Sequence, residues 1–111
     1  MWGTTKNFID KDAMREYLRC FSKKTIHASC EDYRAAATID IKDHNKDKNK
    51  KIHCPVLVIW GKKATLEKLY NPITEWKKWA NNVQGHSLNC GHFIPEEKPR
   101  QFIDSVENFF N

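Results

Sequence analysis

The chain has 111 residues, of which 40% are apolar and 30% are charged. These proportions are typical of globular proteins and exclude a disordered or collagen-like chain, and the length excludes a multidomain enzyme. The net charge is +5, which would favour polyanion binding only if the basic residues gathered on one face.

Membrane and export signals are missing from this sequence. No apolar run approaches the roughly 20 residues that cross a bilayer, and residues 1–12 lack the apolar stretch of a signal peptide. We therefore expect a soluble, unexported, cytoplasmic chain without a membrane partner. In that compartment cysteines stay reduced, so four free thiols are expected, at Cys20, Cys30, Cys54 and Cys90.

Two helices are expected in the first third of the chain. An apolar stripe with helical spacing predicts a helix over residues 11–22, which Asp10 or Asp12 could cap; its members are Met14, Tyr17, Leu18 and Phe21. Ser29 stands three residues ahead of Asp32, close to a capping box. This pattern predicts a second helix over about residues 30–41, which contains Tyr33.

The next segment, residues 42–53, is rich in lysine and contains no apolar residue between Lys42 and Lys51. Such a segment cannot bury a face, and we expect a solvated loop that links two structural units. Nucleic-acid binders add stacking aromatic side chains to basic runs. None is present here, and the lysines alternate with aspartates, so we expect no nucleic-acid partner.

Residues 54–111 have the pattern of an α/β unit. A continuous apolar run over residues 55–60 predicts a strand buried on both faces of a parallel sheet. A helix is expected from Pro72 onward, with Trp79 and Ala80 still on its apolar face, followed by a second strand over residues 83–88. A last helix is expected after Pro99; its apolar stripe is Phe102, Ile103, Val106, Phe109 and Phe110.

This arrangement is incomplete as a sheet. Two strands joined by one crossover leave the strand at residues 55–60 with an unpaired edge and a bare apolar face. We therefore expect these residues to be a piece of something larger.

Among candidate reactive groups, His92 stands out. It follows Gly91 directly after a predicted parallel strand, where α/β enzymes place reacting groups, although an ordinary loop histidine is an equally good interpretation. Residues 85–89 almost match the nucleophile elbow G-x-S-x-G, but Ser87 lies inside the predicted strand, where that turn cannot form. The spacing of cysteine and histidine fits no zinc motif, so we expect no metal and no cofactor.

Two stretches carry a family resemblance. The strand CPVLVIWG at residues 54–61, followed by the stretch CGHFIPEE at residues 90–97, resembles the C-terminal part of α/β-hydrolase-fold haloacetate dehalogenases. The stretch HASCEDYRAA at residues 27–36 is similar to the end of the helical cap in that family. The resemblance implies cap helices in residues 1–41, a linker in 42–53 and the last two parallel strands with their flanking helices in 54–111.

The resemblance also implies roles for two residues. His92 would be the general base of a catalytic triad, and Tyr33 would be the cap tyrosine whose hydroxyl helps hold the leaving halide. In this family an aspartate displaces the halide from a small haloacid, and a water activated by histidine then hydrolyses the ester. Many α/β-hydrolases carry the triad acid shortly after the strand that ends at Gly61, but here that position is Ala64. This departure favours the dehalogenase group over generic hydrolases and epoxide hydrolases.

The nucleophile elbow and the triad acid are not encoded in these 111 residues. We therefore expect a C-terminal fragment of a dehalogenase-like α/β-hydrolase that is inactive alone and whose partner would be an N-terminal hydrolase half. The alternative is a non-catalytic binding or assembly module derived from an α/β-hydrolase or epoxide hydrolase, which would pair through its bare sheet edge.

Overall fold

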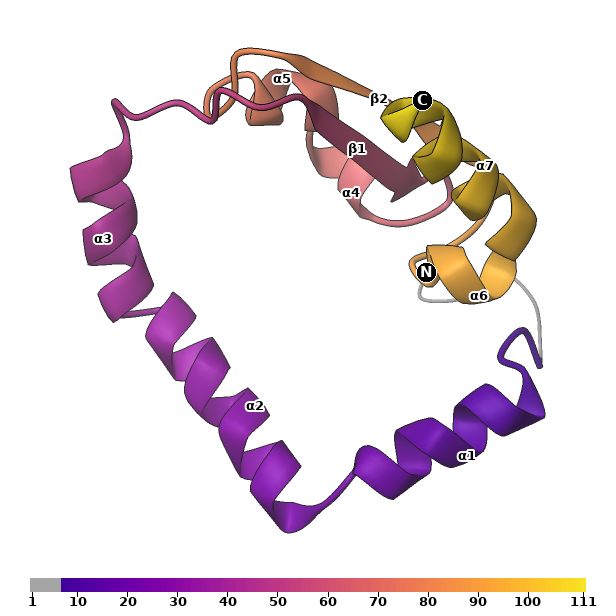
Figure 1. Cartoon of the computed structure of the whole chain (residues 1–111). Coiled ribbons are helices and arrows are strands. Elements are labelled where there is room, and N and C mark those ends of the chain that lie inside the picture. Colours follow the sequence, from indigo (N-terminus) through magenta and orange to yellow (C-terminus); the bar gives the residue numbers. More distant parts are fainter. Residues whose placement is uncertain (1–6) are drawn as a thin grey trace. The chain divides into compact units, whose positions relative to one another are not determined.

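The computed structural model describes residues 7–111, which form two compact units (Figure 1). One unit is Asp10–Lys50, which contains three helices and no strand. The other is Lys51–Asn111 together with the described residues up to Ile9, and it contains the sheet. Residues 1–6, the start of the expected cap segment, lie outside the described part. The division into cap, linker and hydrolase core stays a prediction.

The first helix, α1, spans Lys11–Cys20. The Asp10 carboxylate accepts hydrogen bonds from the backbone N–H groups of Asp12 and Ala13, at 2.8 and 3.3 Å. These bonds satisfy two of the donors that the first turn of a helix leaves without a partner. The predicted helix and its Asp10 cap are confirmed, and the helix ends two residues before the expected residue 22.

The second helix, α2, spans Lys23–Ala36, so the predicted start near residue 30 was wrong. Ser22 caps it instead, because the Ser22 hydroxyl accepts the Thr25 N–H at 3.2 Å. The helix also ends before the expected residue 41. The Thr38 hydroxyl donates to the Arg34 carbonyl at 2.7 Å, which satisfies one of the last carbonyls of α2.

The third helix, α3, spans Ile39–Asp47 and corrects the expectation of a loop that begins at residue 42. Ion pairs three residues apart join Asp43 to Lys46 at 2.8 Å and Asp47 to Lys50 at 2.6 Å. Pairs at this spacing support the polar part of the helix, residues 42–47. The sequence interpretation noted the aspartates but did not consider that they pair with lysines one turn away. As expected, every residue of segment 42–53 is exposed.

The sheet has two parallel strands, β1 (Val56–Gly61) and β2 (Val83–Leu88), as predicted. Their register runs from Val56 opposite Val83 to Gly61 opposite Leu88. Both carboxyl ends therefore lie at the same edge of the sheet. An isolated parallel bridge between Ile52 and Ala80 extends the pairing toward the amino ends.

Between the strands lie two short helices, α4 (Leu66–Leu69) and α5 (Pro72–Trp76). The predicted helix from Pro72 is therefore present but ends earlier than expected, and α4 was not predicted. Residues 77–79 form turns, and Ala80 then bridges to Ile52, where the Ile52 N–H donates to the Trp79 carbonyl at 2.8 Å.

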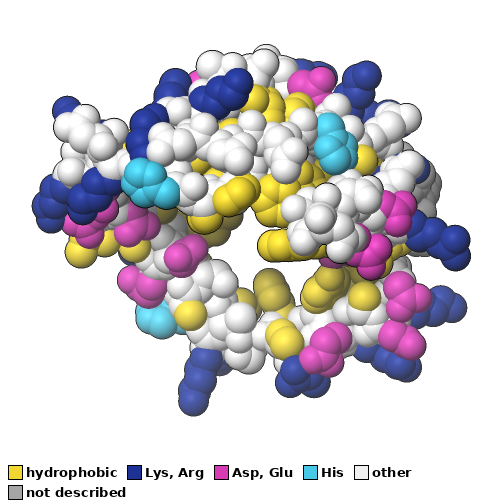
Figure 2. Space-filling model, turned by 45° about the horizontal axis from the view of Figure 1, so that its top comes forward, with side chains coloured by type: hydrophobic (Ala, Val, Ile, Leu, Met, Phe, Trp, Pro, Cys, Tyr) yellow, Lys and Arg dark blue, Asp and Glu magenta, His cyan; other side chains and the backbone are white. Residues whose placement is uncertain are grey.

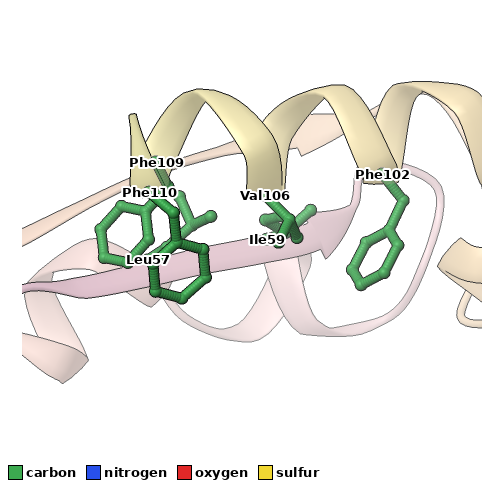
Figure 3. A pocket seen from close by; sticks show the side chains of 6 residues that line it. All are labelled: Leu57, Ile59, Phe102, Val106, Phe109 and Phe110. Carbon is green, nitrogen blue, oxygen red and sulfur yellow. The ribbon is translucent and has the colours of Figure 1, made fainter.

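After β2 follow α6 (Ile94–Glu97) and α7 (Pro99–Phe110), and α7 confirms the predicted last helix. The apolar stripe of α7 faces β1 across a cavity of about 410 Å³ (Figure 3). The side chains that line it are Leu57, Ile59, Phe102, Val106, Phe109 and Phe110.

Burial in the described residues is low. The apolar core consists of Val58, Ala64, Ala80, Leu88 and Cys90. Within β1 only Val58 and Gly61 are buried. The prediction of a strand buried on both faces is therefore wrong for this chain. On one face of β1, Leu57 and Ile59 line the cavity that separates the strand from α7, and both side chains stay half-buried. None of the helices α1, α2 and α3 contains a buried residue, and apolar side chains show at the surface (Figure 2).

Every helix in the described residues 7–111 is too short or too polar to cross a membrane.

Candidate functional site

The candidate site lies where the carboxyl ends of β1 and β2 meet. Gly61 is the last residue of β1 and is paired with Leu88, the last residue of β2. The loop of residues 89–93, called here the His92 loop, leads from β2 to α6 and carries the His92 side chain, which is exposed. The sequence prediction that His92 follows a parallel strand is confirmed; its catalytic role stays a prediction.

Backbone hydrogen bonds join the start of the His92 loop to the segment that follows β1. The Lys62 N–H donates to the Leu88 carbonyl at 2.8 Å, and the Lys63 N–H donates to the Cys90 carbonyl at 2.9 Å. These two bonds continue the ladder of the sheet beyond its last paired residues. The His92 loop therefore begins as an extension of the sheet.

Gly61 allows this close approach. A Cβ atom at Gly61 would lie 1.7 Å from the Gly91 carbonyl oxygen and 3.0 Å from the Cys90 carbonyl oxygen. Any side chain at this position would push the His92 loop away from β1. The absence of a side chain at Gly61 thus sets the separation between the strand end and the loop.

Glu97 holds the same loop from the other side. Both carboxylate oxygens of Glu97, the last residue of α6, lie 3.0 Å from the Gly91 backbone nitrogen, whose N–H they accept. The Ile94 N–H donates to the His92 carbonyl at 3.1 Å. The sequence interpretation quoted Glu97 within the motif but assigned it no role. The available signal was the pairing of Gly91 with an acid six residues later.

Cys90 fills the space beneath the loop. Its side chain is fully buried, and this burial raises the pKa of the Cys90 thiol, an effect to which the Glu97 carboxylate adds. A raised pKa keeps the thiol neutral, so Cys90 acts as a small apolar side chain here. Cys20, Cys30 and Cys54 are exposed, and all four cysteines are free thiols, as expected.

Aromatic rings lie beside His92. The His92 and Phe93 rings meet edge to face, with centroids 5.3 Å apart. Phe93 also stacks on Phe8, again with a centroid separation of 5.3 Å. The imidazole thus has an apolar neighbour on its own loop.

Tyr33, the second predicted site residue, belongs to the helical unit. It lies on α2, and its side chain is 78% exposed. A phenol at this exposure is accessible to a ligand. The predicted role of Tyr33 as a halide ligand stays a prediction.

The serine considered in the sequence analysis and two other histidines have structural explanations in the sheet unit. Ser87 lies within β2 opposite Trp60, away from any strand-to-helix turn, in agreement with the rejection of a nucleophile elbow. Within the sheet unit, His86 Nε2 lies 3.0 Å from the Ser105 hydroxyl, and His53 Nδ1 lies 3.1 Å from the Asn81 amide nitrogen. In residues 7–111 there is no group of three or more histidine, cysteine or acidic side chains that could hold a metal ion.

Comparison with known proteins finds relatives that match nearly the whole of this chain. A fluoroacetate dehalogenase from Burkholderia sp. is 32% identical over 99% of this chain, and a soluble epoxide hydrolase from Corynebacterium sp. is 33% identical over 98%. The chain spans about 37% of the length of both relatives. A scan of protein-family models finds no match.

Solved structures agree with this comparison. A structure from Nostoc sp. PCC 7120 that is assigned to the α/β-hydrolases is 46% identical, with a TM-score of 0.94 over 99% of this chain and 38% of its own. A structure from Salmonella enterica that is assigned as an acyltransferase is 44% identical, with a TM-score of 0.91 over 97% of this chain and 36% of its own. The chain is thus a small α/β arrangement of two parallel strands and flanking helices that matches a little over a third of an α/β-hydrolase structure.

Proposed function

We propose that this chain is the C-terminal portion of an α/β-hydrolase that breaks the carbon–halogen bond of small haloacids. The observation that carries this proposal is the 32% identity to the fluoroacetate dehalogenase, which extends over 99% of the chain. His92 is the general base in this proposal, and Tyr33 is a ligand of the departing halide.

The reaction needs groups that these residues do not supply. A carboxylate from the N-terminal portion displaces halide from the carbon next to the substrate carboxylate, and an ester forms on the enzyme. His92 then removes a proton from a water molecule, which attacks the ester carbonyl. The alkoxide oxygen of the hydroxy acid takes up this proton as the ester bond breaks, and the enzyme carboxyl group releases a proton to solvent, which restores the carboxylate. Imidazole changes protonation near neutral pH, which suits it to this step.

Ala64 supports a dehalogenase over other α/β-hydrolases. The segment after β1, where many α/β-hydrolases carry the triad acid, is hydrogen-bonded to the His92 loop through Lys63 and Cys90. An acid at Ala64 would therefore stand close to that loop, yet the residue is a buried alanine, 5% exposed. The acid that orients His92 then comes from the N-terminal portion, as the resemblance to haloacetate dehalogenases implies.

Tyr33 fits the halide step by its chemistry. A phenol is a hydrogen-bond donor, and a donor aimed at the leaving halide stabilises the charge that develops on it. The exposed side chain of Tyr33 leaves the hydroxyl accessible.

Halide release from fluoroacetate and chloroacetate tests the proposal. We expect no release by the 111-residue chain alone, because most of the site is supplied elsewhere. Fused behind the N-terminal portion of the Burkholderia dehalogenase, the chain should release halide, and His92→Ala should reduce kcat at least about a thousandfold. Tyr33→Phe should reduce it about a hundredfold. The matched control is His27→Asn, which replaces an exposed histidine on α2 and should retain activity.

Turnover by the chain alone that disappears in His92→Ala would refute the proposed division of the site between two portions. A fusion that folds but hydrolyses an epoxide and no haloacid would refute the substrate class.

A second function, a binding or assembly module without catalysis, is favoured by one observation. β1 pairs with β2 along one edge, and in the described residues no strand pairs with its other edge. Such an edge can accept a strand from another polypeptide. A stable, stoichiometric complex with an N-terminal hydrolase half that releases no halide would support this function over the dehalogenase.

A further inference from the structure

The clearest feature that the proposed function leaves without a role is the bond between Glu97 and Gly91. The Gly91 N–H is the donor of the peptide unit that links Cys90 to Gly91, next to the peptide unit that leads into His92. Both carboxylate oxygens of Glu97 lie 3.0 Å from this nitrogen. The bond spans six residues and ties the end of α6 back to the loop.

This bond is stronger than an ordinary contact between a side chain and the backbone. An ionised acceptor makes a hydrogen bond roughly twice as strong as a neutral one. Gly91 is buried and Glu97 is half-buried, so water competes only weakly for the donor. Loss of the carboxylate would leave a buried N–H without its partner, which is unfavourable.

The bond also completes a set of restraints around His92. On the near side of the histidine, the Cys90 carbonyl accepts the Lys63 N–H at 2.9 Å. On the far side, the His92 carbonyl accepts the Ile94 N–H at 3.1 Å. With the Gly91 N–H held by Glu97, the backbone is fixed on both sides of the residue that carries the imidazole.

We propose that Glu97 is a positioning residue for His92, because its carboxylate holds the Gly91 N–H and so fixes the backbone from which the imidazole projects. The role as positioning residue of a general base rests on the proposed function. The restraint on the His92 ring is independent of the proposed function and can be measured separately.

Nuclear magnetic resonance of the full chain labelled with ¹⁵N tests the restraint. In Glu97→Ala we expect the Gly91 amide to exchange with solvent about ten to a hundred times faster, as the loss of a charge-assisted bond implies. The His92 ring resonances should broaden or shift, because the backbone that carries the ring is no longer held. Assignment of the ring follows from the signals lost in His92→Ala.

Two further variants separate positioning from general stability. Glu97→Gln keeps one acceptor oxygen without the charge, so we expect values between those of the native chain and Glu97→Ala. Glu107→Gln removes the same charge from an exposed position on α7. It should leave the exchange of the Gly91 amide and the His92 ring resonances unchanged. If the Gly91 amide loses protection while the His92 ring resonances stay native, Glu97 is merely structural and the proposal is overturned. An unchanged Gly91 amide overturns it as well.

The active fusion protein supplies the kinetic readout. Displacement of a reacting group by about 1 Å lowers the rate by as much as a hundredfold, so Glu97→Ala should lower kcat about ten- to a hundredfold with KM unchanged and Glu97→Gln should recover part of it. A native kcat in Glu97→Ala overturns the catalytic part of the proposal. If the fusion with native Glu97 releases no halide, the proposed function fails, and the ring measurements on the chain still decide the restraint.

Discussion

Gly61 is the residue on which the geometry of the candidate site depends most. Its missing side chain lets the Gly91 carbonyl approach to a point where a Cβ atom would be only 1.7 Å away. The two backbone bonds from Lys62 and Lys63 can form only at this separation. The φ angle of Gly61 is not positive. Glycine is therefore required here because a side chain would not fit, and not because of the backbone conformation.

We predict that Gly61→Ala destabilises the sheet unit by about 1–3 kcal/mol, the usual effect of forcing extra volume into a packed site. Because the obstructing atoms belong to the backbone, the His92 loop must move as a whole. Urea unfolding measures the loss of stability, and the amide shifts of Cys90 and Gly91 report the movement. An alanine variant with native stability and native shifts would show that the loop does not approach β1 this closely.

Among the helices, α1 shows how one side chain determines where an element begins. The N–H groups of Asp12 and Ala13 lower the pKa of the Asp10 carboxyl from its ordinary value of 3.8. A lowered pKa means that the folded helix favours the ionised cap. Helix α1 is therefore stabilised at neutral pH, and the stabilisation is lost as the pH falls through the pKa of folded Asp10.

We predict that Asp10→Ala lowers the helix content at pH 7 and that the difference from the native chain shrinks as the pH falls through the lowered pKa of folded Asp10. Far-ultraviolet circular dichroism as a function of pH measures both effects. Asp32→Ala, in the interior of α2, is the control and should show no such dependence on pH. A difference in helix content that does not shrink as the solution is acidified would contradict the capping role.

At the level of the complete chain, the two units differ in how they are stabilised. The sheet unit has a small core around Val58, Leu88 and Cys90, whereas the helices α1, α2 and α3 bury no residue. Without buried apolar surface, a helix depends on its caps and on ion pairs between exposed side chains, which contribute little. The helical unit should therefore open more often than the sheet unit.

We predict that trypsin cuts within Asp10–Lys50 at least about ten times faster than within β1 or β2 and their connecting segment. Lysine and arginine occur in both units, so the difference reflects opening and not the number of sites. Mass spectrometry of the early products measures the order of cleavage. First cuts between the strands would show that the sheet unit is the less stable of the two. Added N-terminal hydrolase half should slow cleavage if it covers these helices.

Local patterns in the sequence were sufficient for much of the fold. The stripe that begins at Met14 predicted α1, and the stripe that begins at Phe102 predicted α7. The β-branched run that ends at Gly61 and the segment that ends at Leu88 were recognised as parallel strands. In each case the information lies within one turn or one strand, so neighbouring residues are enough to reveal it.

The errors occurred where distant residues or paired charges decide the conformation. The helix expected to include Ala80 ends at Trp76, and Ala80 instead bridges to Ile52, a residue far away in the chain. The segment that contains Asp43 and Lys46 is helical, because their charges pair one turn apart. Hydropathy alone describes neither effect.

The amino-acid order was enough to mark His92 as the candidate base, because a histidine after a glycine at the end of a strand is a local pattern. The close fit of Gly61 against Gly91 and the hold of Glu97 on the Gly91 N–H were decided only by the folded chain. Both contacts join residues that the sequence separates by 30 and 6 positions, and their geometry exists only once the strands have paired and α6 has formed.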